Sequence, residues 1–594
     1  MTVAAPALDK AREMLRTTFG FSDFRGRQAD VVERVLAGQS TLAVMPTGAG
    51  KSLTYQLPAV LLDGTCVVIS PLIALMHDQL RSARANGIRA ATLTSADADW
   101  RETLDAFRAG ELDLLYVAPE RASQPGFRDL LTSARLALFA VDEAHCVSEW
   151  GHDFRPDYRQ LRPLMDAFPQ VPRIALTATA DSQTRADVLA QLGIPEDGLV
   201  LAGFDRPNIR YAIAHRDNPV RQLTELMASH PGPGIVYVQT RRKAEDIAEK
   251  LAAATGRPVR PYHAGLDAPL RAANQAAFVA SEDMVIVATV AFGMGIDKPD
   301  VRFVAHVGVP KSIEGYYQET GRAGRDGDPA LAKMLWGAAD FATARSRLAE
   351  LPQDRQRAER LRLDALAGLV ETAECRRALL LRHFGEEPPE TCGNCDNCLD
   401  KPGVTDVTEL ARKLLSAAYR TGQSFGFGHL QKVLTGSQDT RVLQKGHDAL
   451  SVFGIVEGED ARLLQPLSRA LQARGALVAN EHGGLALGGE ARAILKGEKP
   501  VEIVVPPRRQ RGRRGGDATP NPVGDPLFDA LRALRKELAE EAQVPPYVIF
   551  HDSTLREMAS GRPSTMAALG RVGGVGARKL EAYGDEFLKV IAEN

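Results

Sequence analysis

The 594-residue sequence contains no apolar run of the roughly 18 residues that a membrane-spanning helix requires. Its first fifteen residues are interrupted by charged side chains at Asp9, Lys10, Arg12 and Glu13, which argues against a secretory signal. Basic residues are not in excess, because 73 lysines and arginines stand against 75 aspartates and glutamates and leave a net charge of −2. We therefore expect a cytoplasmic protein, in which binding to nucleic acid would depend on local patches and not on overall charge.

Cysteine is also scarce, since six residues in a chain of this length are too few for a disulfide framework. Four of them form a cluster: Cys375, expected on a helix, is followed by Cys392, Cys395 and Cys398. Cysteines separated by two other residues can place their sulfurs around one metal ion, and four thiolates favour tetrahedral Zn²⁺ in a closed, structural site. An iron–sulfur cluster stays open as an alternative, because spacing alone does not exclude it.

The chain does contain two series of short apolar runs separated by amphipathic stretches. The runs are typical of buried parallel strands, because polar and apolar residues do not alternate in them. The first series comprises residues 66–69, 112–117, 136–141 and 174–176, and the second residues 235–238, 285–287 and 303–307. Two series predict two α/β lobes, which residues 202–208 would connect.

The nucleotide-binding candidate is a glycine-rich loop, residues 45–52, with the sequence Met-Pro-Thr-Gly-Ala-Gly-Lys-Ser. We call it the phosphate loop, because backbone amides in such a loop cradle phosphates, while Lys51 reaches the β- and γ-phosphates and Ser52 ligates Mg²⁺. The strict pattern has glycine where this chain has Met45, so the match is to the helicase variant. The predicted contacts are Thr47, Gly48, Gly50, Lys51 and Ser52.

An acidic box, Asp142-Glu143-Ala-His145, directly follows the run at residues 136–141. A carboxylate at the end of a strand can hold Mg²⁺, which we assign to Asp142, and Glu143 beside it can polarise the attacking water. We place His145 with these catalytic residues. The phosphate loop and the acidic box in this order predict a working ATPase site, in preference to a glycine-rich turn and a solvated strand end.

With these motifs, the chain resembles the RecQ family of superfamily-2 helicases over about residues 8–495, and more weakly over the last 65 or so. The resemblance implies ATP-driven 3′→5′ movement on single-stranded DNA and duplex unwinding, with roles in recombination, repair and the SOS response. It also implies that Arg25 and Gln28 contact the adenine base. A glutamine amide suits this task because it presents a donor and an acceptor together.

Residues 148–156 resemble the aromatic-rich loop that distinguishes RecQ proteins. Trp150 and Phe154 can stack on the bases of a single strand, at roughly 1–3 kcal/mol per base, with Arg155 beside them. Their position close to Asp142 would let bound DNA influence the ATPase. The alternative is that Trp150 is a core aromatic residue.

In the second lobe, residues 318–327 place Arg322 and Arg325 three apart in a glycine-flanked turn. Two such arginines can project together toward a phosphate between the lobes, and an arginine finger contributes roughly 10³–10⁵ in turnover. We therefore expect closure of the lobes to couple hydrolysis to movement. A salt-bridged turn without catalytic function is the alternative.

The C-terminal half resembles the RecQ winged helix and the HRDC domain. Gly483-Gly484 would turn the wing hairpin and place His482 near its tip as a DNA contact, although the hairpin is short. In the HRDC-like part, Arg578 and Lys579 follow a glycine-rich turn that can approach phosphates, or that only caps a helix. The arginine run at residues 508–514 would add salt-sensitive affinity for DNA or serve as a solvated tether.

The expected architecture is two RecA-like α/β parallel-sheet lobes, a helical zinc-binding subdomain, a winged helix, a flexible linker and a small all-α HRDC domain. The expected boundaries are residues 1–204, 205–340, 341–404, 405–497, 498–526 and 527–594, in that order. The expected cofactors are ATP, Mg²⁺ and Zn²⁺, and DNA is the expected partner. The resemblance also implies a monomer, a single-strand-binding protein as partner and a place at the bacterial nucleoid. An RNA helicase, and a DNA-binding or annealing scaffold with a vestigial ATPase, are the rival interpretations.

Overall fold

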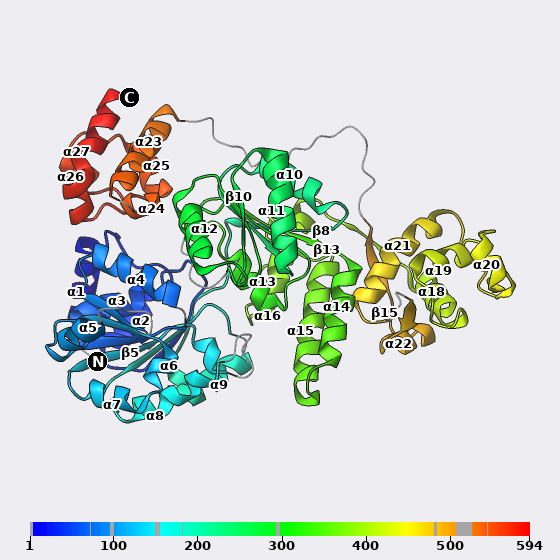
Figure 1. The fold of residues 1–594 in the computed structure, drawn as a ribbon, viewed down its shortest axis with the longest axis horizontal. Helices are drawn as coiled ribbons and strands as arrows, with labels where there is room; N and C mark the ends of the chain where they lie inside the picture. The colour runs from blue at the N-terminus through cyan, green and yellow to red at the C-terminus, as the bar shows by residue number, and fades with distance from the viewer. Residues whose placement is uncertain are drawn as a thin grey trace.

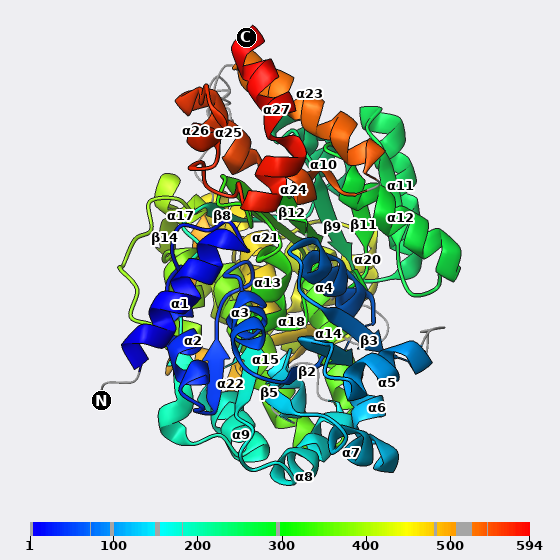
Figure 2. The same ribbon diagram turned by 90° about the vertical axis from the view of Figure 1, so that its left-hand side faces the viewer.

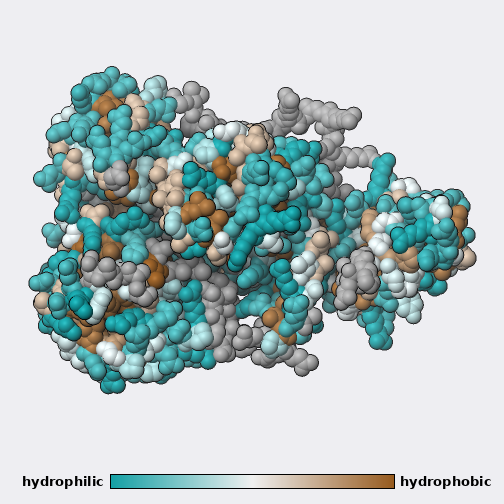
Figure 3. Space-filling model, in the orientation of Figure 1, coloured by the Kyte–Doolittle hydropathy of each residue, from teal (hydrophilic) through white to brown (hydrophobic). Residues whose placement is uncertain are grey.

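The computed structural model describes residues 4–71, 73–94, 100–148, 155–180, 182–292, 298–479, 484–505, 525–542 and 544–594. The second α/β lobe lies in the centre, the winged region extends from it at one end, and the first α/β lobe and a small helical module lie at the other end (Figure 1). Within the described ranges, no helix combines the length and the apolar character needed to cross a bilayer. The face in Figure 3 is mainly hydrophilic, with small scattered apolar patches, as is usual for a protein in water.

The first lobe is built on a seven-stranded sheet with strand order β3-β4-β2-β5-β6-β1-β7, in which every pairing is parallel. Its strands are β1 (Thr41–Val44), β2 (Thr65–Ile69), β3 (Ala90–Leu93), β4 (Leu114–Val117), β5 (Leu136–Val141), β6 (Arg173–Thr177) and β7 (Leu199–Leu201). Its helices are α1 (Ala4–Thr17), α2 (Gln28–Leu36), α3 (Leu53–Leu61), α4 (Ile73–Ala85), α5 (Trp100–Arg108), α6 (Pro119–Ala122), α7 (Pro125–Leu131), α8 (Leu161–Asp166) and α9 (Ser182–Leu192). The central strands are apolar throughout because both faces of the sheet are buried.

The second lobe has a six-stranded parallel sheet with strand order β10-β11-β9-β12-β13-β8. Its strands are β8 (Ile209–His215), β9 (Gly234–Val238), β10 (Val259–Tyr262), β11 (Val285–Ala288), β12 (Phe303–Val307) and β13 (Ala330–Trp336). Its helices are α10 (Pro219–Ser229), α11 (Arg241–Thr255), α12 (Ala268–Ala280) and α13 (Ile313–Thr320). These two sheets confirm the predicted pair of α/β lobes.

A helical segment with the four clustered cysteines follows the second sheet; we call residues 338–399 the cysteine subdomain. Its helices are α14 (Ala338–Ala349), α15 (Gln353–Glu371), α16 (Arg376–His383) and α17 (Asp396–Leu399). Buried residues of α15 and α16, such as Leu366 and Leu381, belong to the same apolar core as residues of both lobes. The subdomain is therefore packed into the motor and is not an appendage.

The winged region has an apolar core of its own. Its elements are β14 (Gly403–Asp406), α18 (Thr408–Arg420), α19 (Phe427–Leu434), α20 (Thr440–Gln444), α21 (Gly458–Ala473), β15 (Leu477–Ala479), β16 (Leu485–Leu487), α22 (Ala491–Lys496) and β17 (Glu502–Val505). Strands β15 and β16 pair antiparallel as the expected wing hairpin. Its tip, with His482, lies outside the described residues.

The predicted start of the flexible linker at residue 498 is wrong. Strand β17 pairs antiparallel with β14, with Val505 opposite Gly403 and Glu502 opposite Asp406. Val501 and Ile503 are buried in the core of the winged region. This alternation of buried and outward-facing residues is the pattern of a half-buried strand, and the proline- and arginine-rich stretch directly after it obscured that pattern.

The C-terminal module consists of five helices around a separate small core. They are α23 (Pro526–Glu541), α24 (Pro546–Ile549), α25 (Asp552–Gly561), α26 (Met566–Leu569) and α27 (Ala577–Glu593). The module lies at the opposite end of the molecule from the winged region, above the first lobe and beside the second (Figures 1 and 2). It touches the first lobe where the amide of Gly574 donates to the carbonyl of Gly20 at 3.0 Å.

Candidate ATPase site and cysteine cluster

The phosphate loop follows β1 and leads into α3, so it lies at the carboxyl edge of the first sheet, where ligands of open α/β sheets bind. Gly48 and Gly50 have φ angles of +84° and +72°, which glycine adopts at little cost. At Gly50, a Cβ atom would stand only 2.5 Å from the side-chain nitrogen of Gln28. The loop conformation therefore requires glycine at both positions.

Gln28 lies directly behind the phosphate loop and is only 4% exposed. Its Nε2 donates to the carbonyl of Ala49 at 2.8 Å, and its Oε1 accepts from the amide of Arg25 at 2.8 Å. Arg25 is exposed and lies 5.7 Å from the centre of the Phe21 ring. The structure thus brings Gln28 to the loop, which it braces, and places Arg25 beside Gln28 through its backbone amide.

The acidic box begins where β5 ends, at the same edge of the sheet. Asp142 is 5% exposed, and its Oδ1 accepts from the amide of Glu143 at 2.9 Å. Burial and the neighbouring Glu143 raise the pKa of Asp142 to about 7, although the Lys51 ammonium opposes the rise. Glu143 has a φ of +48°, an unusual value for a non-glycine residue that is often found at functional sites.

Gln79 on α4 connects the two predicted Mg²⁺ ligands, and no local pattern in the sequence points to it. Its Nε2 lies 3.4 Å from Ser52 Oγ, and its side chain also hydrogen-bonds to Asp142. Its Oε1 accepts from the Tyr55 hydroxyl at 2.7 Å. The Asp142 carboxylate and the Ser52 hydroxyl, held together by this amide, are hard oxygen donors that fit Mg²⁺.

His145 is buried, and burial together with the charges of Lys51 and Arg155 lowers its pKa to about 3. The imidazole is therefore neutral near pH 7. Its Nδ1 lies 3.0 Å from Thr177 Oγ1 and 3.4 Å from Glu143 Oε2, so the ring connects the acidic box to the end of β6. This geometry fits a residue that orients Glu143 better than one that carries a proton.

The arginine turn, residues 321–328, directly contacts the phosphate loop. A Cβ atom at Gly48 would lie 3.2 Å from Cγ of Arg325, and one at Gly321 would lie 3.3 Å from Cβ of Thr47. Arg322 is 6% exposed, and its charge acts on the buried Tyr237 hydroxyl. Arg325 thus reaches the phosphate loop from the second lobe, whereas the interaction of Arg322 is with Tyr237 of its own lobe.

The predicted DNA-binding loop, residues 148–156, is described only at its two ends. Trp150 and Phe154 lie outside the described residues. Arg155 donates to the carbonyl of Pro71 at 3.0 Å, and its amide donates to the carbonyl of Cys146. Arg155 therefore connects the end of this loop to Pro71, which follows β2, and to Cys146, which follows the acidic box.

The four clustered cysteines converge, with all four sulfurs within 4.8 Å of one another. The sulfurs of Cys392 and Cys398 are 3.9 Å apart, as are those of Cys375 and Cys395. A tetrahedron of Zn–S bonds near 2.3 Å has edges of about 3.8 Å, so this arrangement fits a four-thiolate zinc site. The sequence predicts Cys375 on a helix, whereas in the structure it is the N-cap residue directly before α16.

Arg578 and Lys579, predicted to bind DNA, are engaged within the chain in this arrangement. Arg578 reaches the carbonyl of Ala85 on the first lobe at 3.5 Å. Lys579 Nζ lies 5.8 Å from the centre of the Phe550 ring, and burial lowers its pKa to about 8. Arg578 is still an exposed residue, whereas Lys579 is partly buried.

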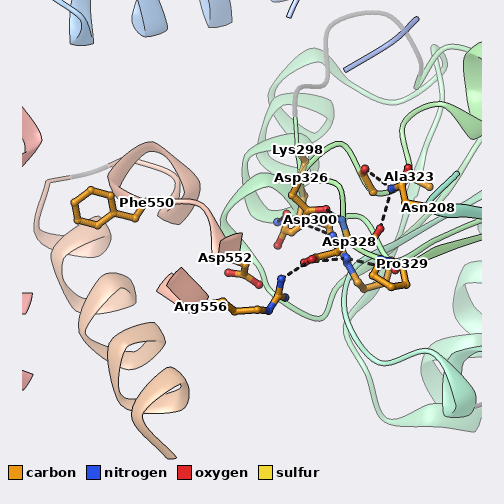
Figure 4. A network of polar contacts seen from close by, with 12 residues as sticks. Asn208, Lys298, Asp300, Ala323, Asp326, Asp328, Pro329, Phe550, Asp552 and Arg556 are labelled. Atoms are coloured by element: carbon orange, nitrogen blue, oxygen red, sulfur yellow. Dashed lines mark hydrogen bonds and ion pairs between the residues drawn. The ribbon is translucent and has the colours of Figure 1, made fainter. Parts of the chain in front are cut away.

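Ion pairs hold the C-terminal module against the second lobe. Arg535, 3% exposed, binds Asp552 of its own module at 2.6 Å and Glu282 of the lobe at 2.8 Å. Arg532 binds the same Glu282 at 3.1 Å. Figure 4 shows a second contact, in which Arg556 points to Asp328 in the arginine turn. The module thus touches the turn that carries Arg325.

We expect Glu282→Lys to release the C-terminal module, because one substitution removes both ion pairs and places a lysine against two arginines. Small-angle scattering should then show a larger radius of gyration than for the unmodified chain. Glu225→Lys, a charge reversal at an exposed position on α10, is the matched control and should leave the profile unchanged. An unchanged profile for Glu282→Lys would show that these pairs do not hold the module.

We also expect Asp142→Asn to stabilise the nucleotide-free protein at pH 8 while abolishing ATP turnover. The folded-state pKa near 7 exceeds the ordinary value of 3.8, so the unmodified protein must ionise a buried group as the pH rises. The stabilising contribution of the protonated Asp142 carboxyl is complete below about pH 4, falls as the pH rises, and is gone above about pH 7. Melting temperatures from pH 5.5 to 8.5 should therefore diverge between the two proteins as the pH rises to about 7 and keep a constant difference above it, and a difference that does not change between pH 5.5 and 7 would contradict this assignment.

Family models match most of the chain. They are DEAD/DEAH box helicase at residues 25–188, Helicase conserved C-terminal domain at 218–327, RecQ zinc-binding at 338–399, RQC domain at 401–512 and HRDC domain at 525–591. The chain is 41% identical to the ATP-dependent DNA helicase RecQ of Haemophilus influenzae, with 98% of this chain and 96% of that protein covered. It is 37% identical to the protein of the same name from Bacillus subtilis, with 98% of each covered.

Proposed function

The chain belongs to the RecQ family of ATP-dependent DNA helicases, and we propose that it hydrolyses ATP between its lobes to move 3′→5′ along single-stranded DNA and separate duplexes. The observation that carries this proposal is the direct contact between the phosphate loop and the arginine turn at Gly48 and Arg325. Groups from two lobes meet at one nucleotide site, so hydrolysis and the relative position of the lobes are necessarily linked.

The chemistry is divided between the lobes. The loop amides and Lys51 bind the phosphates, and Glu143, oriented by His145, polarises the attacking water. Ser52 and Asp142 would hold Mg²⁺, which neutralises phosphate charge when bound. Arg325 approaches from the second lobe and stabilises the charge that develops on the transferred phosphoryl group, with Arg322 behind it.

The remaining parts of the proposal concern the ligands and partners. The four cysteines would hold a structural Zn²⁺, because their sulfurs fit its tetrahedron and a RecQ zinc-binding model covers them. Trp150, Phe154 and Arg155 would contact single-stranded DNA, and His482, Arg578 and Lys579 would contribute further DNA contacts. We further propose a monomer at the nucleoid that acts in recombination and repair beside a single-strand-binding protein.

Steady-state ATPase and unwinding assays test the proposal. We expect single-stranded DNA to raise ATP turnover at least tenfold and RNA to do so far less, with unwinding of duplexes that carry a 3′ overhang. Lys51→Ala should lose ATP turnover and keep DNA affinity, because the lysine binds the phosphates of ATP and does not contact DNA. ATP turnover at the same rate with and without DNA would exclude a motor and favour an annealing scaffold, whereas preference for RNA would favour the other rival.

A further inference from the structure

The segment that connects the lobes carries an arginine whose hydrogen bonds reach both of them. Arg206 Nη1 donates to the carbonyl of Thr47 in the phosphate loop at 2.7 Å and to that of Gly321 at 3.2 Å. Its Nη2 donates to the carbonyls of Ala323 and Gly324 at 3.0 and 2.9 Å. One guanidinium therefore bridges the phosphate loop and the arginine turn.

The chemistry of this bridge requires arginine. A planar guanidinium offers five donors in a fixed fork, so it can bind carbonyls of two loops at once, whereas an ammonium is a point charge on a flexible stem. All four bonds go to backbone carbonyls and so depend on how the loops are placed. A Cβ atom at Gly48 would lie 3.5 Å from Arg206 Nη1 and 3.2 Å from Arg325 Cγ, so the two arginines pack against the same point of the loop.

The cysteine subdomain holds the same connecting segment from the other side. Arg377, 6% exposed, donates to the carbonyls of Pro207 and Ile209 at 3.1 and 2.8 Å. Asn394 donates to the carbonyl of Pro207 at 3.1 Å. The Phe204 ring stacks on Phe384 with 4.7 Å between the ring centres. The backbone on both sides of Arg206 is thus fixed by residues of this subdomain.

These holding residues are close in sequence to the clustered cysteines. Arg377 is the second residue after Cys375, and Asn394 lies between Cys392 and Cys395. The Glu386 carboxylate, between the two, accepts from the amide of Phe204. The fold that the cysteines organise therefore determines where the connecting segment runs.

We propose that Arg206 is a positioning residue for ATP hydrolysis, and that the cysteine subdomain sets its position by holding the connecting segment. Arg206 fixes the arginine turn relative to the phosphate loop, so that Arg325 meets the developing charge. It does not bind the nucleotide, since Lys51 and the loop amides do that. This inference rests on the proposed ATPase function and adds a role for the subdomain beyond stability.

The test compares the full chain with Arg206→Gln and Arg206→Lys in ATPase assays at saturating single-stranded DNA. Misplacing a catalytic group by about 1 Å costs about 10² in rate, so we expect Arg206→Gln to lower kcat by about that factor. KM for ATP and DNA affinity should change by less than about threefold, because the groups that bind both ligands are unchanged. Arg206→Lys should remain at least about tenfold slower than the unmodified chain, because lysine keeps the positive charge and lacks the planar guanidinium that binds both loops.

A second pair of variants tests the role of the subdomain. Arg377→Gln removes two bonds to the connecting segment and should lower kcat in the same way, with zinc content by elemental analysis unchanged. Arg382→Gln, on the same helix α16 but paired with the exposed Glu374, is the matched control and should match the unmodified chain.

Three results would overturn the inference. The first is full kcat in Arg206→Gln, and the second is full kcat in Arg206→Lys. The third is a fall of kcat in Arg206→Gln that occurs only close to a lowered melting temperature of that variant. Full kcat in Arg377→Gln would remove the part assigned to the subdomain. An unmodified chain without DNA-stimulated turnover would instead refute the proposed function, so the two failures are distinguishable.

Discussion

Replacing Arg325 by alanine is expected to lower DNA-stimulated ATP turnover by roughly 10³-fold or more, the lower end of the effect of an arginine finger. The side chain runs along Gly48 of the phosphate loop, so its removal takes the cation of the second lobe away from the reacting phosphate. Lysine should not restore turnover fully, because the planar guanidinium binds phosphate oxygens in pairs. Initial rates over a range of ATP concentrations measure the effect.

The pattern of constants distinguishes a catalytic loss from a folding defect. An interaction made only in the transition state lowers kcat and kcat/KM equally, so KM for ATP should be nearly unchanged. Arg347→Ala, an arginine on the exposed side of α14, is the control and should keep full turnover. If Arg325→Ala retained more than about a tenth of the rate, the arginine turn would be structural and the salt-bridge alternative would stand.

The sequence predicted the interior of both sheets better than their edges. Strands β2, β5, β9 and β11 are internal and apolar, and each overlaps a predicted run. Edge strand β10 includes Arg260 and Pro261, which an outer strand tolerates because one side of it is unpaired. Its composition therefore gives no sign of a strand, and the same holds for edge strand β8, which includes Arg210 and His215.

Chemistry within short motifs was also predictable, because spacing along one turn fixes which groups meet. The phosphate loop, the acidic box and the cysteine pattern are of this kind. Gln79 and Arg206 are not, since each acts across the fold: Arg206 is 159 residues from Thr47 and 115 from Gly321. Such contacts leave no periodicity or spacing in a single sequence, so only the three-dimensional arrangement shows them.

Replacing Cys395 by serine is expected to abolish metal binding and leave most of the chain insoluble. Cys395 is fully buried at the start of α17, and a serine hydroxyl is a poor substitute for a thiolate ligand. Structural Zn²⁺ sites contribute about 10–16 kcal/mol in peptides, an amount as large as the whole stability of a typical domain. Because the cysteine subdomain shares its core with both lobes, its unfolding should spread to the motor.

Elemental analysis and soluble yield measure this outcome. The unmodified chain should contain one zinc ion, since four thiolates complete one tetrahedron. Cys66→Ala also removes a buried cysteine, but from strand β2, where it belongs to the apolar core of the first lobe. It should therefore keep its zinc and lose only modest stability. Iron in the unmodified chain would favour a cluster, and full solubility of Cys395→Ser without metal would show that the subdomain folds by apolar packing alone.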